Sequence, residues 1–278
     1  MNRENGIVLQ VEDVSKHFGG LVAVDHLTFE VKESEILGII GPNGAGKSTI
    51  LGVISGFYEA TSGTVFFQER DITRLKAHQI VQLGIGRNFQ ASTLFMSLSV
   101  LDNVFYGFHL SYHTPIWKRL CRLPSATKEE RSLRKRGEEI LERMGLGAVK
   151  NEITKNLPHG YQRILGVCIA MATNPKLLLL DEPVTGMNQT EIETMLELVR
   201  GMRDRGITIV MIEHNMPAVM SLCDRIVVLD HGLKIAEGLP GEISENPRVI
   251  EAYLGTAEPE AVGDGQATGN QEPDGSLR

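Results

Sequence analysis

A glycine-rich stretch near the start of the chain is compatible with only a few kinds of local structure. It reads Gly41-Pro42-Asn43-Gly44-Ala45-Gly46-Lys47-Ser48 and fits the spacing G-x-x-x-x-G-K-[ST]. Residues 36–40 before it are apolar and of strand length, and residues 48–54 after it have the apolar spacing of a helix. A strand, a glycine-rich turn and a helix in this order predict a phosphate-binding loop.

The residue types in this loop suit a phosphate ligand. Glycines let backbone N–H groups point towards a triphosphate, and the following helix adds the positive end of its dipole. We expect Lys47 to reach the outer phosphates and Ser48 to place its hydroxyl on Mg²⁺. A glycine-rich turn without a ligand is the alternative, but the flanking strand and helix argue against it. The loop therefore indicates a nucleotide and leaves the reaction open.

A second signal is a leucine run that ends in two carboxylates. Leu177–Leu180 are too apolar for a half-exposed strand, which predicts a strand buried on both faces. Asp181 and Glu182 follow at its carboxyl end, where open α/β sheets bind ligands. In a nucleoside triphosphatase, Asp181 would hold Mg²⁺ through water, and Glu182 would orient and deprotonate the attacking water. An acidic turn is the alternative for such a pair in isolation.

Three weaker signals lie elsewhere in the sequence. His214 follows the apolar run 207–213, at a strand end from which a side chain could touch a γ-phosphate. Gln90 stands at the exit of another strand-like run. Phe18 lies in the glycine-rich segment 16–20, where its ring could either stack on a base or plug a hairpin. Local sequence leaves both roles of Phe18 open.

The remaining periodic segments predict a mixed α/β fold. Residues 7–11 and 21–31 alternate between apolar and polar, which predicts antiparallel strands laid beside the strand of the phosphate-binding loop. We further expect a strand at 64–67, helices at about 126–144 and 191–205, and a hairpin at 225–236.

The middle of the chain has a different character. Residues 94–105 hold more apolar surface than one short helix needs for its own core, so we expect part of it to face a partner. The charged run 128–136 interleaves opposite charges at i, i+3 and i+4, which is typical of a solvated helix. From Thr256 onward, glycine, proline and acidic residues replace apolar ones, which predicts disorder.

The composition of the 278 residues argues against several classes of protein. A net charge of -7 is unlike that of a nucleic-acid binder. The sequence has no run near the ~20 apolar residues of a membrane span, and Met1–Asn5 lack the apolar core of a signal peptide. Cys121, Cys168 and Cys223 have no metal-type spacing, and an odd count suits a reducing compartment. We expect a cytoplasmic chain with structural cysteines.

Taken in order, these motifs resemble the ATP-binding subunit of an ABC transporter. The resemblance runs from about Ile7 to Gly255. It implies an α/β fold of the P-loop NTPase class, with a RecA-like core, an N-terminal antiparallel β subdomain and an inserted helical subdomain at about 92–165. Residues 1–255 would form this ABC ATPase domain, and residues 256–278 a disordered acidic tail.

The resemblance also implies roles for single residues. Phe18 corresponds to the aromatic that stacks on adenine, and Gln90 to the residue that senses the γ-phosphate and Mg²⁺. Glu182 corresponds to the general base and His214 to the switch histidine, with Lys47 beside them in catalysis. Ser48, Gln90 and Asp181 would hold Mg²⁺. The residues expected to contact ATP are Phe18, Gly41, Pro42, Asn43, Gly44, Ala45, Gly46, Lys47, Ser48, Thr49 and Gly160.

One motif departs from the family pattern. The signature, usually L-S-G-G-Q, stands here as Leu157-Pro158-His159-Gly160-Tyr161. In the family, the signature serine and glycine amides bind the γ-phosphate of ATP held by the opposite subunit. Pro158 supplies neither a hydroxyl nor an N–H, so the amide of Gly160 and the helix dipole remain. The alternative function is therefore a nucleotide-binding scaffold with weak hydrolysis that works beside an active paralogue.

Within the family, the sequence is similar to the larger ATPase of bacterial branched-chain amino acid importers. The similarity rests on Phe18–Leu21, Gly56–Tyr58, Gly86–Gln90 and the ending Glu251–Gly255. It implies transmembrane permease subunits as partners and a second ATPase, either another copy or a paralogue, in a head-to-tail dimer. A periplasmic or extracellular solute-binding protein would be an indirect partner, and nucleic acid none. The implied location is the cytoplasmic face of the inner membrane, as a peripheral subunit.

Overall fold

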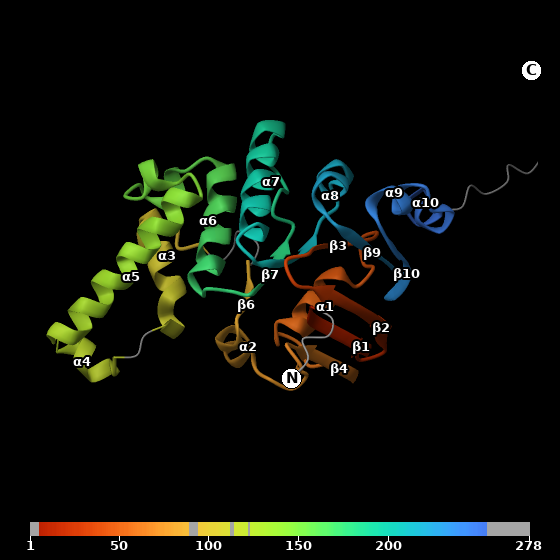
Figure 1. Cartoon of the computed structure of the whole chain (residues 1–278), viewed down its shortest axis with the longest axis horizontal. Helices are drawn as coiled ribbons and strands as arrows, with labels where there is room; N and C mark the ends of the chain where they lie inside the picture. Colours follow the sequence, from red (N-terminus) through yellow and green to blue (C-terminus); the bar gives the residue numbers. More distant parts are fainter. Residues whose placement is uncertain (1–5, 89–93, 112–113, 122, 255–278) are drawn as a thin grey trace, which may run out of the picture.

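The computed structural model describes residues 6–88, 94–111, 114–121 and 123–254 of the chain. Its strands form two sheets, and most of its helices lie on one side of the larger sheet (Figure 1). Among the described residues, none of the helices combines the length and the apolar character needed to cross a membrane.

The larger sheet has six strands and carries the phosphate-binding loop near its centre. Its strands in spatial order are β10 (Leu233–Gly238), β9 (Arg225–Asp230), β3 (Ile36–Ile40), β8 (Thr208–Ile212), β7 (Leu177–Asp181) and β6 (Ile85–Arg87). The strands from β9 to β6 run parallel, and β10 closes one edge as the antiparallel arm of a hairpin with β9. Parallel strands end at the same edge, so the segments after β3, β7 and β8 come together.

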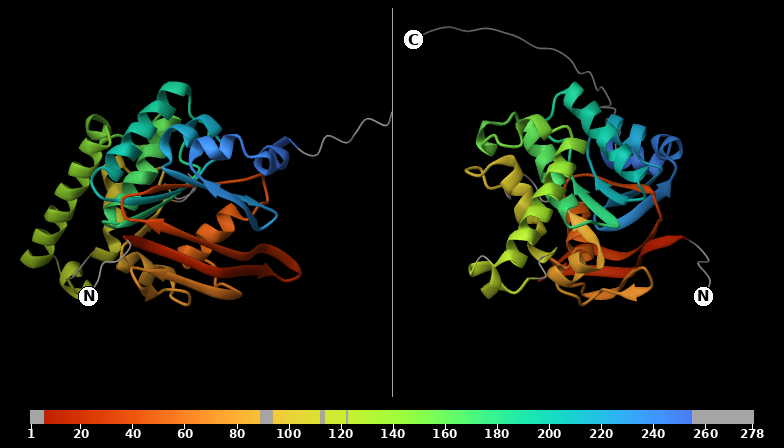
Figure 2. Two further views of the ribbon diagram at one scale, coloured as in Figure 1. Left: turned by 45° about the vertical axis from the view of Figure 1, so that its right-hand side comes forward. Right: turned by 60° about the vertical axis from the view of Figure 1, so that its left-hand side comes forward.

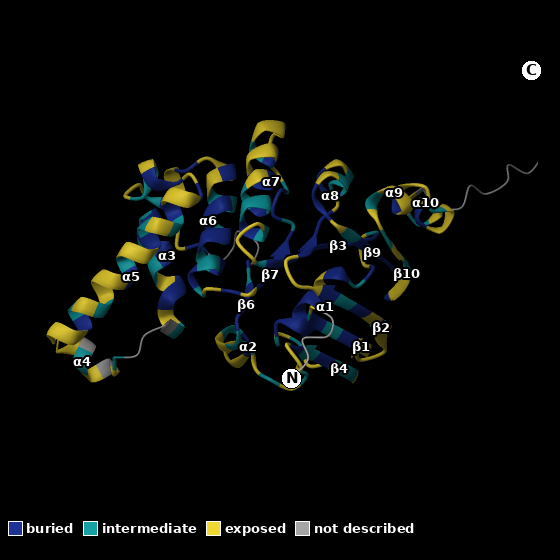
Figure 3. Ribbon diagram, in the orientation of Figure 1, coloured by how far each residue is buried: buried dark blue, intermediate teal, exposed yellow. Residues whose placement is uncertain are grey.

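The larger sheet is buried on both faces because apolar side chains of its central strands alternate between two cores. In β3, Leu37 and Ile39 pack into one core, and Ile36 and Ile40 into the other. The central strands β3, β7 and β8 are buried along their whole length (Figure 3). For β7, this confirms the prediction made from the unbroken apolar run of residues 177–180.

The smaller sheet is antiparallel. It comprises β2 (Leu21–Lys32), β1 (Ile7–Phe18), β4 (Ser62–Phe67) and β5 (Arg70–Asp71), in that order. The prediction that the first strands lie beside β3 is wrong, because both edges of β3 are already paired with β8 and β9. The smaller sheet instead faces the larger one, with α1 (Lys47–Ile54) between them (Figure 2).

The helices of the middle segment pack against one another beside the edge strand β6. They are α3 (Val100–Gly107), the 3₁₀ turn η2 (Phe108–Ser111), α4 (Ile116–Leu120), α5 (Pro124–Arg143) and α6 (His159–Ala172), with 3₁₀ turns η3 (Gly147–Val149) and η4 (Thr154–Asn156) before α6. The remaining helices are α2 (Ala77–Leu83), α7 (Gln189–Arg203), α8 (Met216–Leu222), α9 (Pro240–Ser244) and α10 (Pro247–Leu254).

Two predicted boundaries need correction. The helix predicted from about Ala126 begins at Pro124, because a proline at the first helical position already has the required φ. Residues 16–18 belong to β1 rather than to the glycine-rich turn, which is confined to Gly19 and Gly20.

Burial divides the apolar run 94–105 and corrects one expectation about the cysteines. Leu94, Val100, Leu101 and Val104 are buried in the protein's own core, whereas Phe95 and Met96 are exposed, so the expectation that part of the run faces a partner stays a prediction. Cys168 and Cys223 are buried, in keeping with a structural role, and burial raises the pKa of the Cys223 thiol to about 12. Cys121 is exposed, so its structural interpretation is wrong.

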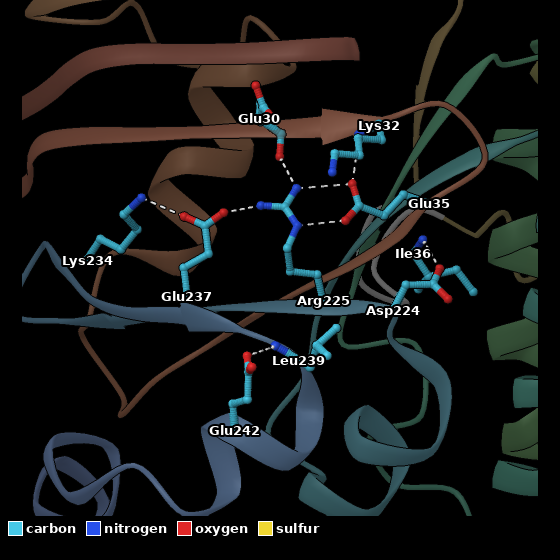
Figure 4. Close-up of polar contacts among 10 residues, drawn as sticks. All are labelled: Glu30, Lys32, Glu35, Ile36, Asp224, Arg225, Lys234, Glu237, Leu239 and Glu242. Atoms are coloured by element: carbon cyan, nitrogen blue, oxygen red, sulfur yellow. Dashed lines mark hydrogen bonds and ion pairs between the residues drawn. The ribbon is translucent and has the colours of Figure 1, made fainter. Parts of the chain in front are cut away.

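An ionic network centred on Arg225 of β9 ties the two sheets together (Figure 4). The guanidinium donates to both carboxylate oxygens of Glu35, at 2.8 and 3.1 Å, and to the carbonyl oxygen of Glu30 in β2, at 2.6 Å. It also pairs with Glu237 of β10. The Glu35 side chain is only 8% exposed and also accepts a hydrogen bond from the Lys32 amide. Such a bidentate pair is strong and depends on guanidinium geometry.

We expect Arg225→Ala to lower the free energy of unfolding by about 3 kcal/mol, because the Glu35 carboxylate would stay buried without its counter-ion. Arg225→Lys should recover part of this loss, since an ammonium group keeps the charge but not the two-pronged contact. Urea denaturation of the full chain measures both values. Arg131→Ala on the exposed surface of α5 is the matched control and should change the free energy by less than about 0.5 kcal/mol. Equal losses in the two alanine variants would contradict the role given to the network.

Candidate functional site

The phosphate-binding loop leaves β3 and enters α1 in a conformation that requires glycine at two positions. Gly41 and Gly46 have φ values of 151° and 98°. A Cβ at Gly41 would overlap the carbonyl oxygen of Leu229, and one at Gly46 would overlap that of Ala23. The loop backbone is therefore wedged between β9 and β2, and only glycine allows this close approach.

Lys47 is the first residue of α1 and turns back towards its own loop. Its Nζ donates to the carbonyl oxygens of Gly41, at 2.8 Å, and Pro42, at 2.7 Å. Burial lowers the pKa of Lys47, and the nearby charges of Glu182 and Asp181 act in the opposite direction. The ammonium group thus lies within the loop, close to both carboxylates at the end of β7.

A pocket of about 360 Å³ opens beside the loop. It brings together the loop, the end of β1, the start of β2 and the first residue after β7. Its lining residues are Phe18, Leu21, Val22, Ala23, Asn43, Gly44, Ala45, Gly46, Lys47, Ser48, Thr49 and Glu182. Most of the predicted nucleotide contacts therefore line one cavity.

Phe18 stands at the rim of this pocket. Its side chain is 41% exposed, and its ring meets that of Tyr58 edge to face, with centroids 5.1 Å apart. The Nζ of Lys16 lies 4.9 Å from the centroid of the Phe18 ring. The ring is therefore held from one side and open to the pocket, an arrangement that suits stacking on a flat ligand.

Asp181, the last residue of β7, is held by two residues that sequence reasoning did not single out. The Nη2 of Arg87 lies 2.8 Å from Asp181 Oδ2, and Arg87 Nη1 donates to Ser55 Oγ. The Asp181 amide donates to Asn88 Oδ1 at 2.7 Å, and the Asn88 amide donates to the Leu179 carbonyl oxygen. Arg87 and Asn88 follow directly from β6, the strand paired with β7.

The surroundings of Asp181 fit a divalent cation. Its Oδ1 is buried and has no hydrogen-bond partner among the residues that the structure describes. A buried carboxylate oxygen without a partner is costly unless a cation meets it. Ser48, the other described residue predicted to hold Mg²⁺, is exposed at the start of α1. The carboxylate of Asp181 and the hydroxyl of Ser48 are hard oxygen donors, which Mg²⁺ prefers as ligands.

Glu182 and His214 come together from neighbouring strands. Glu182 directly follows β7 and has a left-handed φ of 49°, which is strained for a residue with a side chain. His214 comes two residues after β8, and its Nδ1 lies 3.8 Å from Glu182 Oε1. Thr185 Oγ1 donates to Glu182 Oε2 at 3.3 Å. Both side chains are reachable from solvent, with 28% of Glu182 and 56% of His214 exposed.

Glu213, between β8 and His214, is a fully buried residue that the sequence analysis missed. Its carboxylate accepts hydrogen bonds from the amides of Val184, at 2.8 Å, and His214, at 3.2 Å. Burial raises the pKa of Glu213, and the backbone amides partly offset this. One carboxylate thus fixes the turn after Glu182 relative to the turn that carries His214.

Gly160 lies apart from this group, in the first turn of α6. None of the residues lining the pocket comes from α6, within the part of the chain that the structure covers. Pro158 is the N-cap of α6 and makes no side-chain capping hydrogen bond. Glu191 of α7 packs so closely on Gly160 that a Cβ there would overlap its carboxylate. Gln90, the other predicted residue of the site, falls outside the described residues.

Comparisons with known proteins agree with this geometry. A family model described as "ABC transporter" matches residues 24–185, and one described as "Branched-chain amino acid ATP-binding cassette transporter" matches residues 234–259. A high-affinity branched-chain amino acid transport ATP-binding protein, LivG of Salmonella typhimurium, is 39% identical over 90% of this chain and 98% of its own length. BraF of Pseudomonas aeruginosa, which bears the same description, is 36% identical over 90% and 98%.

Solved structures with the same fold are also found. A nucleotide-free ATP-binding cassette from an ABC transporter superposes with a TM-score of 0.80 at 30% identity, covering 90% of this chain and 99% of that one. A dimeric ATP-binding cassette in a post-hydrolysis state, bound to ADP and Pi, gives a TM-score of 0.71 at 25% identity, covering 84% and 98%. With the phosphate-binding loop, the carboxylates after β7 and the histidine after β8 at one sheet edge, the chain belongs to the ABC transporter family, among its ATP-binding cassettes.

Proposed function

We propose that this chain binds ATP with Mg²⁺ and hydrolyses it to energise a permease that imports branched-chain or related amino acids. The observation that carries the proposal is the meeting of Lys47, Ser48 and Glu182 in one pocket, beside the carboxylate of Asp181. The solute is inferred from relatives described as branched-chain amino acid transport ATP-binding proteins.

The loop and its lysine perform the electrostatic part of the reaction. Phosphoryl transfer needs little covalent chemistry, so catalysis rests on positioning and on neutralising the charge of the phosphates. Lys47 exchanges the carbonyl oxygens of Gly41 and Pro42 for phosphate oxygens, while loop amides bind the remaining ones. Ser48, Asp181 and Gln90 would hold Mg²⁺, which supplies further neutralising charge when bound.

Glu182 acts as the general base. Its strained backbone aims the carboxylate into the pocket, where it accepts a proton from the attacking water. The Nδ1 of His214 lies 3.8 Å from Glu182 Oε1, and we assign His214 to contact with the γ-phosphate. Glu213 holds both turns through backbone amides, so it positions Glu182 and His214 without touching the substrate.

The separation of Gly160 from the pocket supports a second ATPase subunit as partner. In a head-to-tail dimer, the N-terminus of α6 faces the phosphates bound by the opposite subunit. The related cassette in the post-hydrolysis state is dimeric. Within one chain, residues 1–255 form the ABC ATPase domain, and residues of about 92–165 form the helical subdomain that carries this signature.

Pro158 favours a second candidate function, a nucleotide-binding scaffold with weak hydrolysis beside an active paralogue. The signature site retains the Gly160 amide and the helix dipole but lacks a hydroxyl at Pro158. A hydrogen bond to a charged phosphate contributes about 1.5–3 kcal/mol, so its absence slows a composite site about tenfold to a hundredfold. The intact Lys47, Asp181 and Glu182 favour the hydrolysing function over the scaffold.

An exposed patch of two aromatic residues and a methionine, beside and on α3, is suited to contact with the permease. We define the patch as Phe95, Met96 and Tyr106, which are 52%, 42% and 54% exposed. The rings of Phe95 and Tyr106 lie 5.3 Å apart. The buried side chain of Asn103 binds both the amide and the carbonyl oxygen of Phe95, so the loop presents the patch rigidly. The permease would hold the chain at the cytoplasmic face of the membrane. The solute-binding protein would act on the other side of the membrane and would be only an indirect partner of this chain.

Glu182→Gln should lower steady-state ATP turnover by about 10²- to 10⁴-fold, because an amide cannot accept the proton of the attacking water. Nucleotide affinity should stay unchanged, since the carboxylate is not needed to bind phosphate. Turnover and equilibrium nucleotide binding by the purified chain measure the two effects. Glu197→Gln, on the exposed face of α7, is the control and should behave like the wild type. A Glu182→Gln variant with wild-type turnover would refute the assignment of the base.

Pro158→Ser should raise ATP turnover about tenfold or more, because the serine hydroxyl adds a hydrogen bond to the γ-phosphate across the dimer. Pro240→Ser, in the first turn of α9, is the matched control. A measurable wild-type rate that rises in Pro158→Ser supports an ATPase with a slow composite site. A silent wild type that becomes active in Pro158→Ser supports the scaffold, and equal rates would show that Pro158 is irrelevant.

Phe95→Asp should release the chain from its permease, because a carboxylate cannot be buried in an apolar contact without a large desolvation cost. The measurement is co-purification of the permease with the tagged chain in detergent. Phe57→Asp is the matched control, since Phe57 is 65% exposed and lies outside the patch. Isolated Phe95→Asp should keep wild-type ATP turnover, and retained co-purification would count against the patch.

A further inference from the structure

We propose that α4 and the first three turns of α5 form a lipid-binding tip that contacts the anionic surface of a bilayer. The lipid-binding tip is defined by three exposed apolar residues, Trp117, Leu120 and Leu123, and by three exposed basic ones, Lys128, Arg131 and Lys135. This proposal concerns a surface distinct from the nucleotide pocket and from the aromatic patch at Phe95.

The fold leaves the three apolar residues of the lipid-binding tip exposed. Trp117 is 57% exposed, Leu120 87% and Leu123 36%. Figure 1 shows α4 at the outer end of the helical segment, away from both sheets. Trp117 and Leu120 belong to α4, and Leu123 is the N-cap of α5. Single exposed apolar residues are ordinary, but a tryptophan and two leucines together within seven residues are typical of a segment that enters a membrane interface.

Charge sets the orientation of the lipid-binding tip. Lys128, Arg131 and Lys135 follow one another at i, i+3 and i+7, on the face of α5 opposite its buried residues Leu133 and Leu141. The acidic residues among them are engaged by the protein itself. Glu130 pairs with Arg134, and Glu129 accepts a hydrogen bond from the amide of Thr114. The exposed face of these turns is therefore basic.

The basic character belongs to this end of α5 alone. Counted on the sequence, residues 117–136 contain eight Lys or Arg and two Glu, in a chain whose net charge is -7. The second half of the same helix carries Glu138, Glu139 and Glu142. A local positive surface on an acidic protein is attracted to anionic lipid and presents only that end to it.

Tryptophan and lysine are also arranged as an interfacial pair. The Nζ of Lys118 lies 5.3 Å from the centroid of the Trp117 ring. Indole rings favour the boundary between headgroups and acyl chains, and lysine stems extend from there to phosphate groups. Lipid supplies both an apolar layer and negative charge at this depth. This complementarity favours a bilayer surface over an apolar protein groove.

The chain contains its own reporter, because Trp117 is its only tryptophan. The experiment titrates the full chain with vesicles of phosphatidylcholine containing about 30% phosphatidylglycerol, and with vesicles of phosphatidylcholine alone. We expect the Trp117 emission to shift to the blue with the anionic vesicles only, and brominated acyl chains to quench it. The shift should be reduced in 0.5 M salt, because screening weakens the attraction of surface charges.

The combined variant Lys128→Glu, Arg131→Glu and Lys135→Glu should bind anionic vesicles about 100-fold more weakly than the wild type. The loss of each basic residue is expected to lower the affinity several-fold. The control combines Arg70→Glu, Lys155→Glu and Arg205→Glu, exposed positions elsewhere with the same change in net charge. Unchanged ATP turnover in both variants shows that they are folded. An emission that stays unshifted with anionic vesicles, or equal weakening in the two variants, would overturn the proposal.

Discussion

The whole arrangement depends on the parallel pairing of β3 with β8 and of β8 with β7. This pairing places the ends of three strands at one edge of the sheet, so the phosphate-binding loop, the two carboxylates and the histidine meet although 173 residues separate Gly41 from His214 in sequence. Burial of these strands on both faces makes the register strict, since a slip by one residue would exchange every side chain between the two cores.

Buried polar side chains beneath the site determine its geometry as much as the residues that face the pocket do. Arg87 and Asn88 fix Asp181 from β6, and Glu213 fixes the turns after β7 and β8 through their backbone amides. Each is largely buried, so each is costly unless all of its bonds are made. The site is therefore held by the edge of the sheet rather than by its loops alone. This arrangement explains how a strained Glu182 is maintained.

Local sequence predicted most elements and the parts of the site that follow a strand or begin a helix. A glycine-rich loop, a leucine run ending in carboxylates and an apolar strand before a histidine each carry their signal within about ten residues. The rest depended on pairing between distant segments. No local pattern shows that Arg87 meets Asp181, 94 residues later, or that Glu213 turns inward while His214 stays exposed. Apolar and polar residues alternate in β1 and β2, which correctly predicts strands. This alternation does not show which strands they pair with, and both edges of β3 are already paired with β8 and β9.

The pairing of β3 with strands from much later in the chain affects how the protein folds during its synthesis. Ile36, at the start of β3, donates its amide to the side chain of Asp224, 188 residues later, and Arg225 reaches back to Glu35 in the same way. During synthesis on the ribosome, the nucleotide loop therefore emerges long before the strands that frame it. Until β8 and β9 follow, β3 has two open edges, and such edges invite pairing with other chains. The native sheet can close only when most of the protein has been translated.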